Sequence, residues 1–189
     1  MNEPVSLLSF DGQERFSKQG VSIGLTIFDF WQFQFSNIYD LQEHIAEFLV
    51  AKALDIDKPY NRSGWTPFDI LLRGTRIEVK ETGYFYSWQE DGKTSNRRSF
   101  RINQTYNAKH IKERQNDIYV FCLNTGETAE DSNPLELEHW EFYVIPTKTI
   151  NEECGNNKTI SLSKVQRLTN KVTFSEIKEC IDDLLDKMS

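Results

Sequence analysis

The sequence has few of the residues and runs that define several large classes of protein. Its three cysteines, Cys122, Cys154 and Cys180, lie far apart, which fits neither a disulfide framework nor a zinc site with paired ligands. No apolar run is long enough to span a bilayer, and the N-terminal segment lacks the basic region of a secretory signal. We therefore expect a cytoplasmic protein that does not associate with a membrane.

Internal repeats, low-complexity tracts and linkers rich in proline, glycine or serine are also missing from the 189 residues. Hydrophobic residues make up 38% of the chain and charged residues 27%, which excludes an intrinsically disordered composition. The length suits one domain of ordinary size. We predict a single domain over residues 1–189.

Charge is unevenly distributed along the chain. The formal net charge is −7, which argues against a protein that coats nucleic acid with its whole surface. Residues 73–114, however, hold ten basic and five acidic side chains, a local charge of +5, so the remainder carries −12. This basic segment is either a solvated face or the footprint of a polyanion, and the neighbouring chemistry must decide between them.

Hydrophobic periodicity predicts helices and strands in alternation. The first 25 residues show no period and predict an irregular lead-in, whereas the aromatic run 25–41 favours a helix. A clearer amphipathic helix ends near Asp55, with a predicted buried stripe of Leu41, Ile45, Phe48, Leu49, Lys52 and Ala53. Strands are predicted at 68–72, 75–81, 98–103, 117–124 and 140–145, and further helices at 106–114, 164–169 and 173–187. This order indicates an α/β fold with a mixed central sheet of about five strands flanked by helices.

The most informative segment is the predicted hairpin around Arg73-Gly74. A two-residue turn there pairs Leu72 with Thr75 and places Asp69 opposite a residue three positions after Thr75. That residue is Glu78. Side chains directly opposite each other in an antiparallel pair have Cβ atoms about 4.5–5.5 Å apart.

Glu78 and Lys80 project from one face of their strand, because alternate side chains share a face. Asp69 and Glu78 repel each other at that distance, and Lys80 neutralises only part of their charge. A divalent cation between the two carboxylates relieves the repulsion, and hard oxygen ligands favour Mg²⁺ or Mn²⁺. Such an ion can activate water and polarise a phosphoryl oxygen, while the lysine stabilises developing negative charge. This chemistry is phosphodiester hydrolysis, and the basic segment begins at the same hairpin.

These residues carry a resemblance to a known family. Residues 65–69 (WTPFD), eight intervening residues and Glu78-Val79-Lys80 resemble the signature of the PD-(D/E)XK nuclease superfamily, which has the restriction-endonuclease-like fold. The resemblance covers about residues 36–146, leaving a predicted C-terminal helical extension over about 147–189. One departure is Phe68, which separates Pro67 from Asp69.

The resemblance implies roles for the individual residues. Asp69, Glu78 and the backbone carbonyl of Val79 would be metal ligands, and Lys80 would serve the attacking water. An acidic residue on the preceding helix would complete the catalytic set; it maps to Glu47, with Glu43 one turn earlier as the alternative. The basic side chains Arg97, Arg98 and Arg101 suit phosphate contacts, although a solvated strand edge explains them equally well.

Three functions remain open from the sequence. The first is a Mg²⁺- or Mn²⁺-dependent endonuclease acting on DNA. The second is a nucleic-acid-binding or assembly subunit that keeps the nuclease fold without its chemistry. The third is a protein-interaction domain that uses the aromatic N-terminal segment. One domain leaves little room for a separate target-reading module, so specificity would come from loops, a second protomer of a homodimer or a partner subunit.

Overall fold

The computed structural model describes residues 10–57, 66–85, 98–128 and 130–188. The chain divides into two compact units, residues 1–38 and residues 39–189. Each unit is described by itself below.

The described part of the first unit starts with a β-hairpin. Strands β1 (Arg15–Lys18) and β2 (Val21–Thr26) pair antiparallel, and the turn between them is Gln19-Gly20 with φ of 51° and 81°. Positive φ at both central residues gives the turn the twist that antiparallel strands need. The prediction of an irregular lead-in was therefore wrong for β1 and β2. In β2, Val21, Ile23 and Leu25 alternate with smaller residues, which is a strand pattern.

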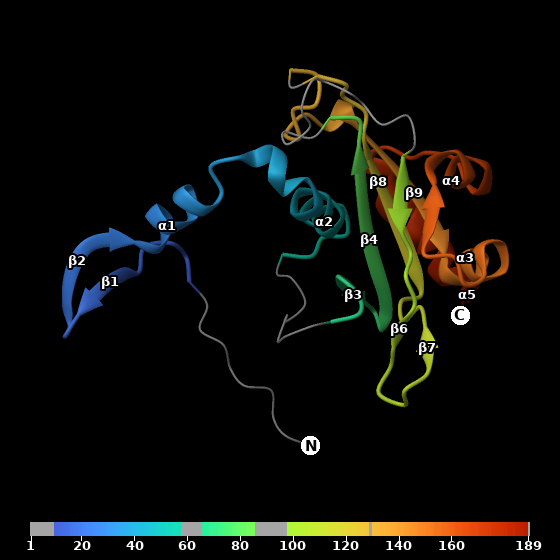
Figure 1. The fold of residues 1–189 in the computed structure, drawn as a ribbon, viewed down its shortest axis with the longest axis horizontal. Coiled ribbons are helices and arrows are strands. Elements are labelled where there is room, and N and C mark those ends of the chain that lie inside the picture. Colours follow the sequence, from blue (N-terminus) through green and yellow to red (C-terminus); the bar gives the residue numbers. More distant parts are fainter. Residues whose placement is uncertain (1–9, 58–65, 86–97, 129, 189) are drawn as a thin grey trace. The chain divides into compact units, whose positions relative to one another are not determined.

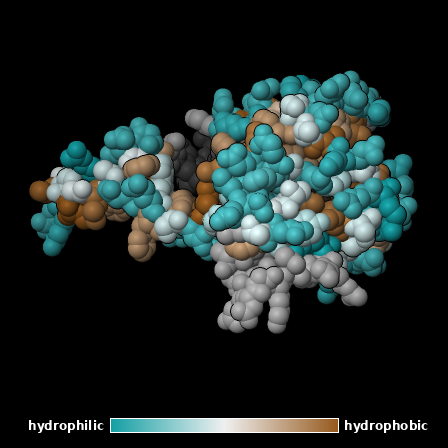
Figure 2. Space-filling model, turned by 90° about the horizontal axis from the view of Figure 1, so that it is seen from above, coloured by the Kyte–Doolittle hydropathy of each residue, from teal (hydrophilic) through white to brown (hydrophobic). Residues whose placement is uncertain are grey.

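Helix α1 (Ile27–Gln34) follows directly. Thr26 and Asp29 form a capping box, in which each side chain accepts a hydrogen bond from the other residue's backbone N–H. The helix predicted over 25–41 is confirmed for this stretch. Figure 2 shows apolar side chains on the surface of this unit, where they belong to exposed residues of α1 and β2: Val21, Ile23, Leu25, Phe28, Phe30 and Phe33.

The second unit is built around a mixed four-stranded sheet with the order β3-β4-β8-β9 (Figure 1). Its strands are β3 (Ile70–Leu72), β4 (Thr75–Gly83), β8 (Ile118–Asn124) and β9 (Trp140–Pro146). The central pair β4–β8 is parallel, and the two outer pairs are antiparallel. All four were predicted as strands, and every residue of β8 is buried, as its continuous apolar run indicated.

The predicted fifth strand of the sheet lies elsewhere. Strand β5 (Ser99–Arg101) pairs with β10 (Thr159–Ser161), and these two form a separate ribbon. Strand β8 pairs with β4. Phe100 of β5 instead packs its ring on that of Phe121 in β8, with centroids 4.8 Å apart. The alternation of apolar residues in 98–103 thus reflects a strand that crosses over the sheet and does not extend it.

The helix predicted over 106–114 is absent from that described stretch. It contains a two-stranded hairpin of β6 (Thr105–Tyr106) and β7 (Lys112–Glu113). The side chain of Asn107 accepts hydrogen bonds from the backbone N–H groups of Lys109 and Ile111, and His110 has a φ of 58°. Such local side-chain bonds satisfy the backbone outside a helix and therefore compete with it.

Helices α2 (Gln42–Ala53) and α5 (Ile177–Met188) cover one face of the sheet. Helix α2 is confirmed in its extent, but its buried positions are Gln42, Ala46 and Val50. Phe48, predicted to be buried, is 58% exposed. The helix is thus rotated relative to the predicted stripe, and Ala46 lets it approach the sheet closely because its side chain is small.

The opposite face of the sheet is covered by the β5–β10 ribbon together with α3 (Thr147–Cys154) and α4 (Leu162–Leu168). Helix α3 falls within the helical extension predicted over about 147–189, whereas strand β10 inside that extension was not predicted. The cap predicted at Thr173 is confirmed, since Thr173 and Glu176 form a capping box before α5. Short 3-10 turns complete the described elements at Ile38–Leu41, Leu137–His139 and Phe174–Glu176.

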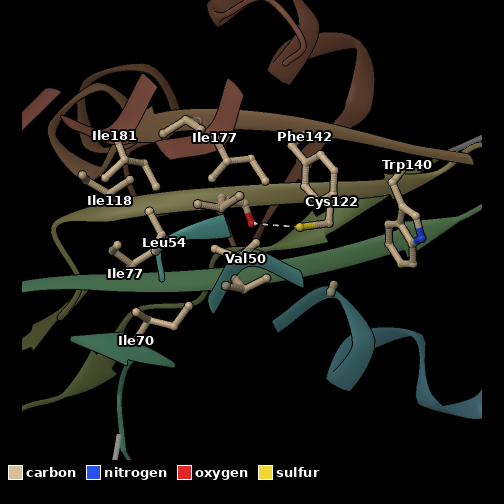
Figure 3. Packing of buried hydrophobic residues seen from close by; sticks show 14 residues of the cluster. Val50, Leu54, Ile70, Ile77, Ile118, Cys122, Trp140, Phe142, Ile177 and Ile181 are labelled. Carbon is tan, nitrogen blue, oxygen red and sulfur yellow. Dashed lines mark hydrogen bonds between the residues drawn. The ribbon is translucent and has the colours of Figure 1, made fainter. Parts of the chain in front are cut away.

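The sheet therefore separates two hydrophobic clusters. In the cluster under α2 and α5, Ile77 and Ile118 of the sheet pack with Val50, Ile177 and Ile181 of the helices (Figure 3). No helix among the described residues is long and apolar enough to cross a membrane.

Candidate active site

The hairpin β3–β4 has the predicted geometry. Its two-residue turn is Arg73-Gly74, with φ of 50° and 87°, and Leu72 pairs with Thr75. The register continues to Ile70 opposite Ile77. The predicted pairing of Asp69 with Glu78 would be the next step, but the regular ladder ends at Ile70 and Asp69 lies just before β3.

At Asp69 the backbone hydrogen bonds between β3 and β4 end, and a hydrogen bond from β4 to the Asp69 side chain follows. Its backbone N–H donates to the carbonyl of Ile77 at 3.0 Å, and its carboxylate Oδ2 accepts the backbone N–H of Val79 at 2.8 Å. The short strand β3 ends here, whereas β4 continues to Gly83. The carboxylate thus occupies the place that the carbonyl of a longer β3 would take.

Glu78 and Lys80 lie on the same face of β4 and form an ion pair. Their side chains are 18% and 22% exposed, so both charges are largely withdrawn from water. Ile77 and Val79 point to the other face and are fully buried in the cluster under α2 and α5. This separation follows from the two-residue period of a strand.

The surroundings of Glu78 disfavour its charged form. Burial raises its pKa, the Lys80 ammonium lowers it, and the negative charges of Asp69 and Glu47 raise it again, to about 7. A carboxyl group in that range exchanges its proton near neutral pH. Burial is the largest cause of this shift and the nearby negative charges of Asp69 and Glu47 add to it, and a cation is stabilised in such a place.

The opposite balance holds for Lys80. Burial alone lowers the pKa of its ammonium, but the charge of Glu78, followed by those of Asp69 and Glu43, raises it above 10.5. Lys80 therefore stays protonated across the physiological range. Both helix carboxylates considered from the sequence act on this group of charges, since Glu47 acts on Glu78 and Glu43 acts on Lys80.

A second acidic group of β4 was missed by the sequence reasoning. Glu81 faces the N-terminal end of α2, where the absent side chain of Gly83 lets the Gln42 amide oxygen approach within 3.1 Å of an ideal Cβ position. Burial, then the charge of Glu43, raises the pKa of Glu81 to about 8, although Arg98 lowers it. Neither Glu81 Oε1 nor the Gln42 amide has a hydrogen-bond partner among the described residues. The sequence did contain a sign of this, because the strand period places Glu81 on the same face of β4 as the apolar residues Ile77 and Val79.

The three arginines suggested for phosphate contacts differ in their placement. Arg101 is exposed on β5. Arg98 is only 7% exposed, so the alternative of a solvated strand edge is wrong for this residue. Arg97 lies outside the described residues, as does Trp65 of the sequence motif.

The donor set around Asp69 and Glu78 fits a hard divalent cation. It provides two carboxylates, with the carbonyl of Val79 between the two charged residues of β4, and oxygen donors of this kind suit Mg²⁺ or Mn²⁺. Within the described ranges, no three or more His, Cys, Asp or Glu side chains are arranged to hold a metal ion.

Comparison of the chain with protein-family models and with curated proteins gave no match. The function must therefore be argued from the geometry and chemistry of these residues, and the resemblance to the PD-(D/E)XK nucleases stays a prediction.

Proposed function

We propose that the protein is a metal-dependent nuclease that hydrolyses phosphodiester bonds, with DNA as its substrate and a restriction-endonuclease-like core. The observation that carries the proposal is the gathering of Asp69, Glu78 and Lys80 where β3 stops and β4 continues. Burial, together with the negative charges of Asp69 and Glu47, raises the pKa of Glu78 to about 7, although Lys80 lowers it. A cluster that disfavours its own ionisation is costly for folding, and a divalent cation would offset that cost.

Each residue has a distinct task in this proposal. Asp69, Glu78 and the Val79 carbonyl would hold Mg²⁺ or Mn²⁺, which polarises a phosphoryl oxygen and lowers the pKa of water when bound. Lys80, protonated at neutral pH, would orient the attacking water and stabilise the charge that develops on the phosphoryl oxygens. Glu47 would contribute to the metal site directly or through a water molecule.

The fold supports the proposal through the elements that surround the site. A helix carrying Glu47 packs on a hairpin that carries Asp69 and Glu78, and the sheet is mixed. This arrangement agrees with the order of a helix followed by motif-bearing strands in the proposed family. The separate β5–β10 ribbon departs from the predicted five-stranded sheet.

The basic segment 73–114 contributes in two ways. Arg76 pairs with Asp117 through its Nη2 at 2.7 Å, and Arg114 is buried among backbone carbonyls, so these charges stabilise the fold. Arg101, Lys109 and Lys112 are exposed. Among the described residues of this segment, they are exposed cations that could attract a polyanion from solution.

Cleavage of plasmid and oligonucleotide DNA with Mg²⁺ or Mn²⁺ tests the proposal. Lys80→Met removes the ammonium while keeping the length of the side chain, and Asp69→Asn keeps an acceptor for the Val79 N–H while removing the charge. We expect each change to lower the cleavage rate by about 10³-fold, and EDTA to abolish cleavage.

The matched control is Lys52→Met, which removes a lysine on α2 that pairs with Asp57. Its rate should equal that of the parent protein. Circular dichroism must show that all three variants are folded. If the parent does not cut with either metal, or if Lys80→Met and Asp69→Asn cut as well as Lys52→Met, the nuclease assignment is wrong.

A second candidate function is an assembly or nucleic-acid-binding subunit that lacks the chemistry. The observation that favours it is the set of large apolar side chains on the surface of the first unit, of which Phe33 is 81% exposed. Such side chains are typical of contacts with another protein. DNA binding that is indifferent to metal and to Glu78→Gln would favour this candidate over the nuclease.

A further inference from the structure

A cavity lies on the same face of the sheet as Glu78 and Lys80, beyond the C-terminal end of β4. It has a volume of about 540 Å³, and its lining includes Tyr84, Arg98, Ser99, Ser161, Ser163 and Gln166. Tyr84 packs against the hydrophobic cluster on this face of the sheet. Among the described residues, the lining combines one cation with several hydroxyl groups and an amide and includes no carboxylate.

Arg98 is the centre of this cavity's chemistry. Its Nη2 donates to the carbonyl of Tyr84 at 2.8 Å, and its guanidinium lies over the Tyr84 ring at 4.8 Å from the centroid. The side chain is thus held in place although it is 93% withdrawn from solvent. Its Nε has no hydrogen-bond partner among the described residues. A buried donor without an acceptor costs free energy, and an anion in the cavity would remove that cost.

No acidic side chain forms an ion pair with Arg98 among the residues that the structure describes. The guanidinium is therefore a positive charge held in a place of low solvent exposure, and it belongs to the described lining of the cavity.

We propose that this cavity binds a non-scissile phosphate group of the nucleic acid strand that lies over Glu78 and Lys80. The planar guanidinium of Arg98 would supply the charge, and the hydroxyls of Ser99, Ser161 and Ser163 would donate to the phosphate oxygens. The proposal rests on the nuclease function, since it assigns part of that substrate.

The spacing along β4 agrees with one strand occupying both places. Tyr84 follows Lys80 by four residues, which corresponds to about 13 Å along a strand. That length matches roughly four nucleotides along a B-form axis, because each DNA strand carries one phosphate per about 3.4 Å. The cavity would thus hold the substrate backbone a few nucleotides from the bond that is cut.

Ser163→Glu is the variant that tests the cavity without disturbing Arg98. Ser163 lies in the first turn of α4 and is exposed, so a carboxylate there agrees with the helix dipole and should not prevent folding. The matched control is Ser175→Glu. Ser175 lies at the same position of the turn that precedes α5, and each serine hydroxyl contacts that of its helix-capping residue, at 3.2 Å and 3.1 Å respectively. Ser175 does not line the cavity.

Binding of fluorescein-labelled single-stranded DNA, followed by anisotropy in EDTA, is the measurement. We expect Ser163→Glu to raise Kd by about tenfold or more, since one charge-assisted contact is lost. The slope of log K against log salt should also become shallower by about 0.7. Ser175→Glu should leave both quantities unchanged. Equal effects of the two variants would show a general repulsion and overturn the proposal.

Two further results separate the cavity from the nuclease chemistry. If Mg²⁺-dependent cleavage by Ser163→Glu keeps the parent KM, the cavity proposal fails while the nuclease function stands. If Ser163→Glu weakens DNA binding in EDTA as expected but the parent never cuts DNA, the nuclease function fails and the phosphate site stands. Inorganic phosphate that raises the melting temperature of the parent but not of Ser163→Glu, with DNA affinity unaffected by that variant, would assign the cavity to a free anion and overturn the proposal.

Discussion

The two faces of strand β4 are alike in burial and opposite in chemistry. Ile77 and Val79 are fully buried against α2 and α5. Glu78 and Lys80 alternate with them along β4 and form an ion pair on the other face. Burial of the apolar side chains stabilises the fold. Burial of the charged side chains opposes it, as the raised pKa of Glu78 shows.

This difference indicates that stability and function are separable on one strand. The apolar face provides the free energy that keeps the charged face in an unfavourable arrangement, and strained arrangements of this kind persist only where the surroundings maintain them. Substitutions on one face should therefore change unfolding, and those on the other should change chemistry. The following predictions test that separation.

The largest effect is expected on the apolar face. Ile77→Ala leaves a cavity between β4 and the two helices and should lower the free energy of unfolding by about 3.5 kcal/mol, measured by urea denaturation. Ile111→Ala is the control, because Ile111 is 52% exposed and its truncation should change stability by at most about 0.5 kcal/mol. Under conditions where Ile77→Ala is still folded, its cleavage rate per folded molecule should match that of the parent. A rate lowered more than the folded fraction would show that the two faces are coupled.

A somewhat smaller effect is expected on the charged face as pH is changed. Glu78 must be ionised to bind a cation, and its pKa of about 7 predicts a rate that falls tenfold per pH unit below 7. Between pH 7 and pH 5 the loss is about 100-fold at magnesium concentrations well below saturation. Raising the magnesium concentration should move the midpoint to lower pH, because the cation favours the ionised form. A profile that is flat over this range, in protein shown to be folded by circular dichroism, contradicts the assigned role of Glu78.

The smallest effect concerns Glu81, the charged residue on the apolar face. Its pKa rises from 4.5 to about 8 on folding, so the folded state holds an extra proton between these values and stability falls as pH rises through that window. Glu81→Gln removes the titration. At pH 6 we expect the variant to be more stable than the parent by about 2 kcal/mol, and at pH 4.5 to be nearly equal to it.

Glu138→Gln provides the reference for that measurement, since it makes the same charge change at an exposed position. Its stability relative to the parent should not depend on pH. Guanidinium denaturation at the two pH values gives the comparison, and a difference between Glu81→Gln and the parent that does not grow with pH would be inconsistent with a buried, protonated Glu81.

Local rules were sufficient to predict the core of the candidate site. The two-residue turn at Arg73-Gly74 determines the register of β3 and β4, and the strand period then puts Glu78 and Lys80 on one face. Both depend on residues that are close in sequence. The positions of Glu78 and Lys80 relative to each other could therefore be predicted before any tertiary contact was known, whereas Asp69 leaves the regular ladder and bonds to Ile77 and Val79.

The features that escaped prediction depend on contacts between distant segments. Strand β5 pairs with β10, about sixty residues later, and nothing in residues 98–103 distinguishes that pairing from one with β4. Arg98 has the sequence context of a surface residue, and only the packing of the Tyr84 ring and β10 around it produces a buried cation. The rotation of α2 likewise depends on the shape of the sheet that it covers.

The hydrogen bond from Val79 to the Asp69 carboxylate has a consequence for solubility. Strand β3 ends at Ile70 while β4 continues to Gly83, and a strand N–H without a partner can bond to a strand of another molecule and start aggregation. Because the Asp69 carboxylate accepts the Val79 N–H, this donor is not offered to an incoming chain. Replacing the aspartate proposed for catalysis with a small apolar residue would therefore release that donor as well as abolish the proposed activity.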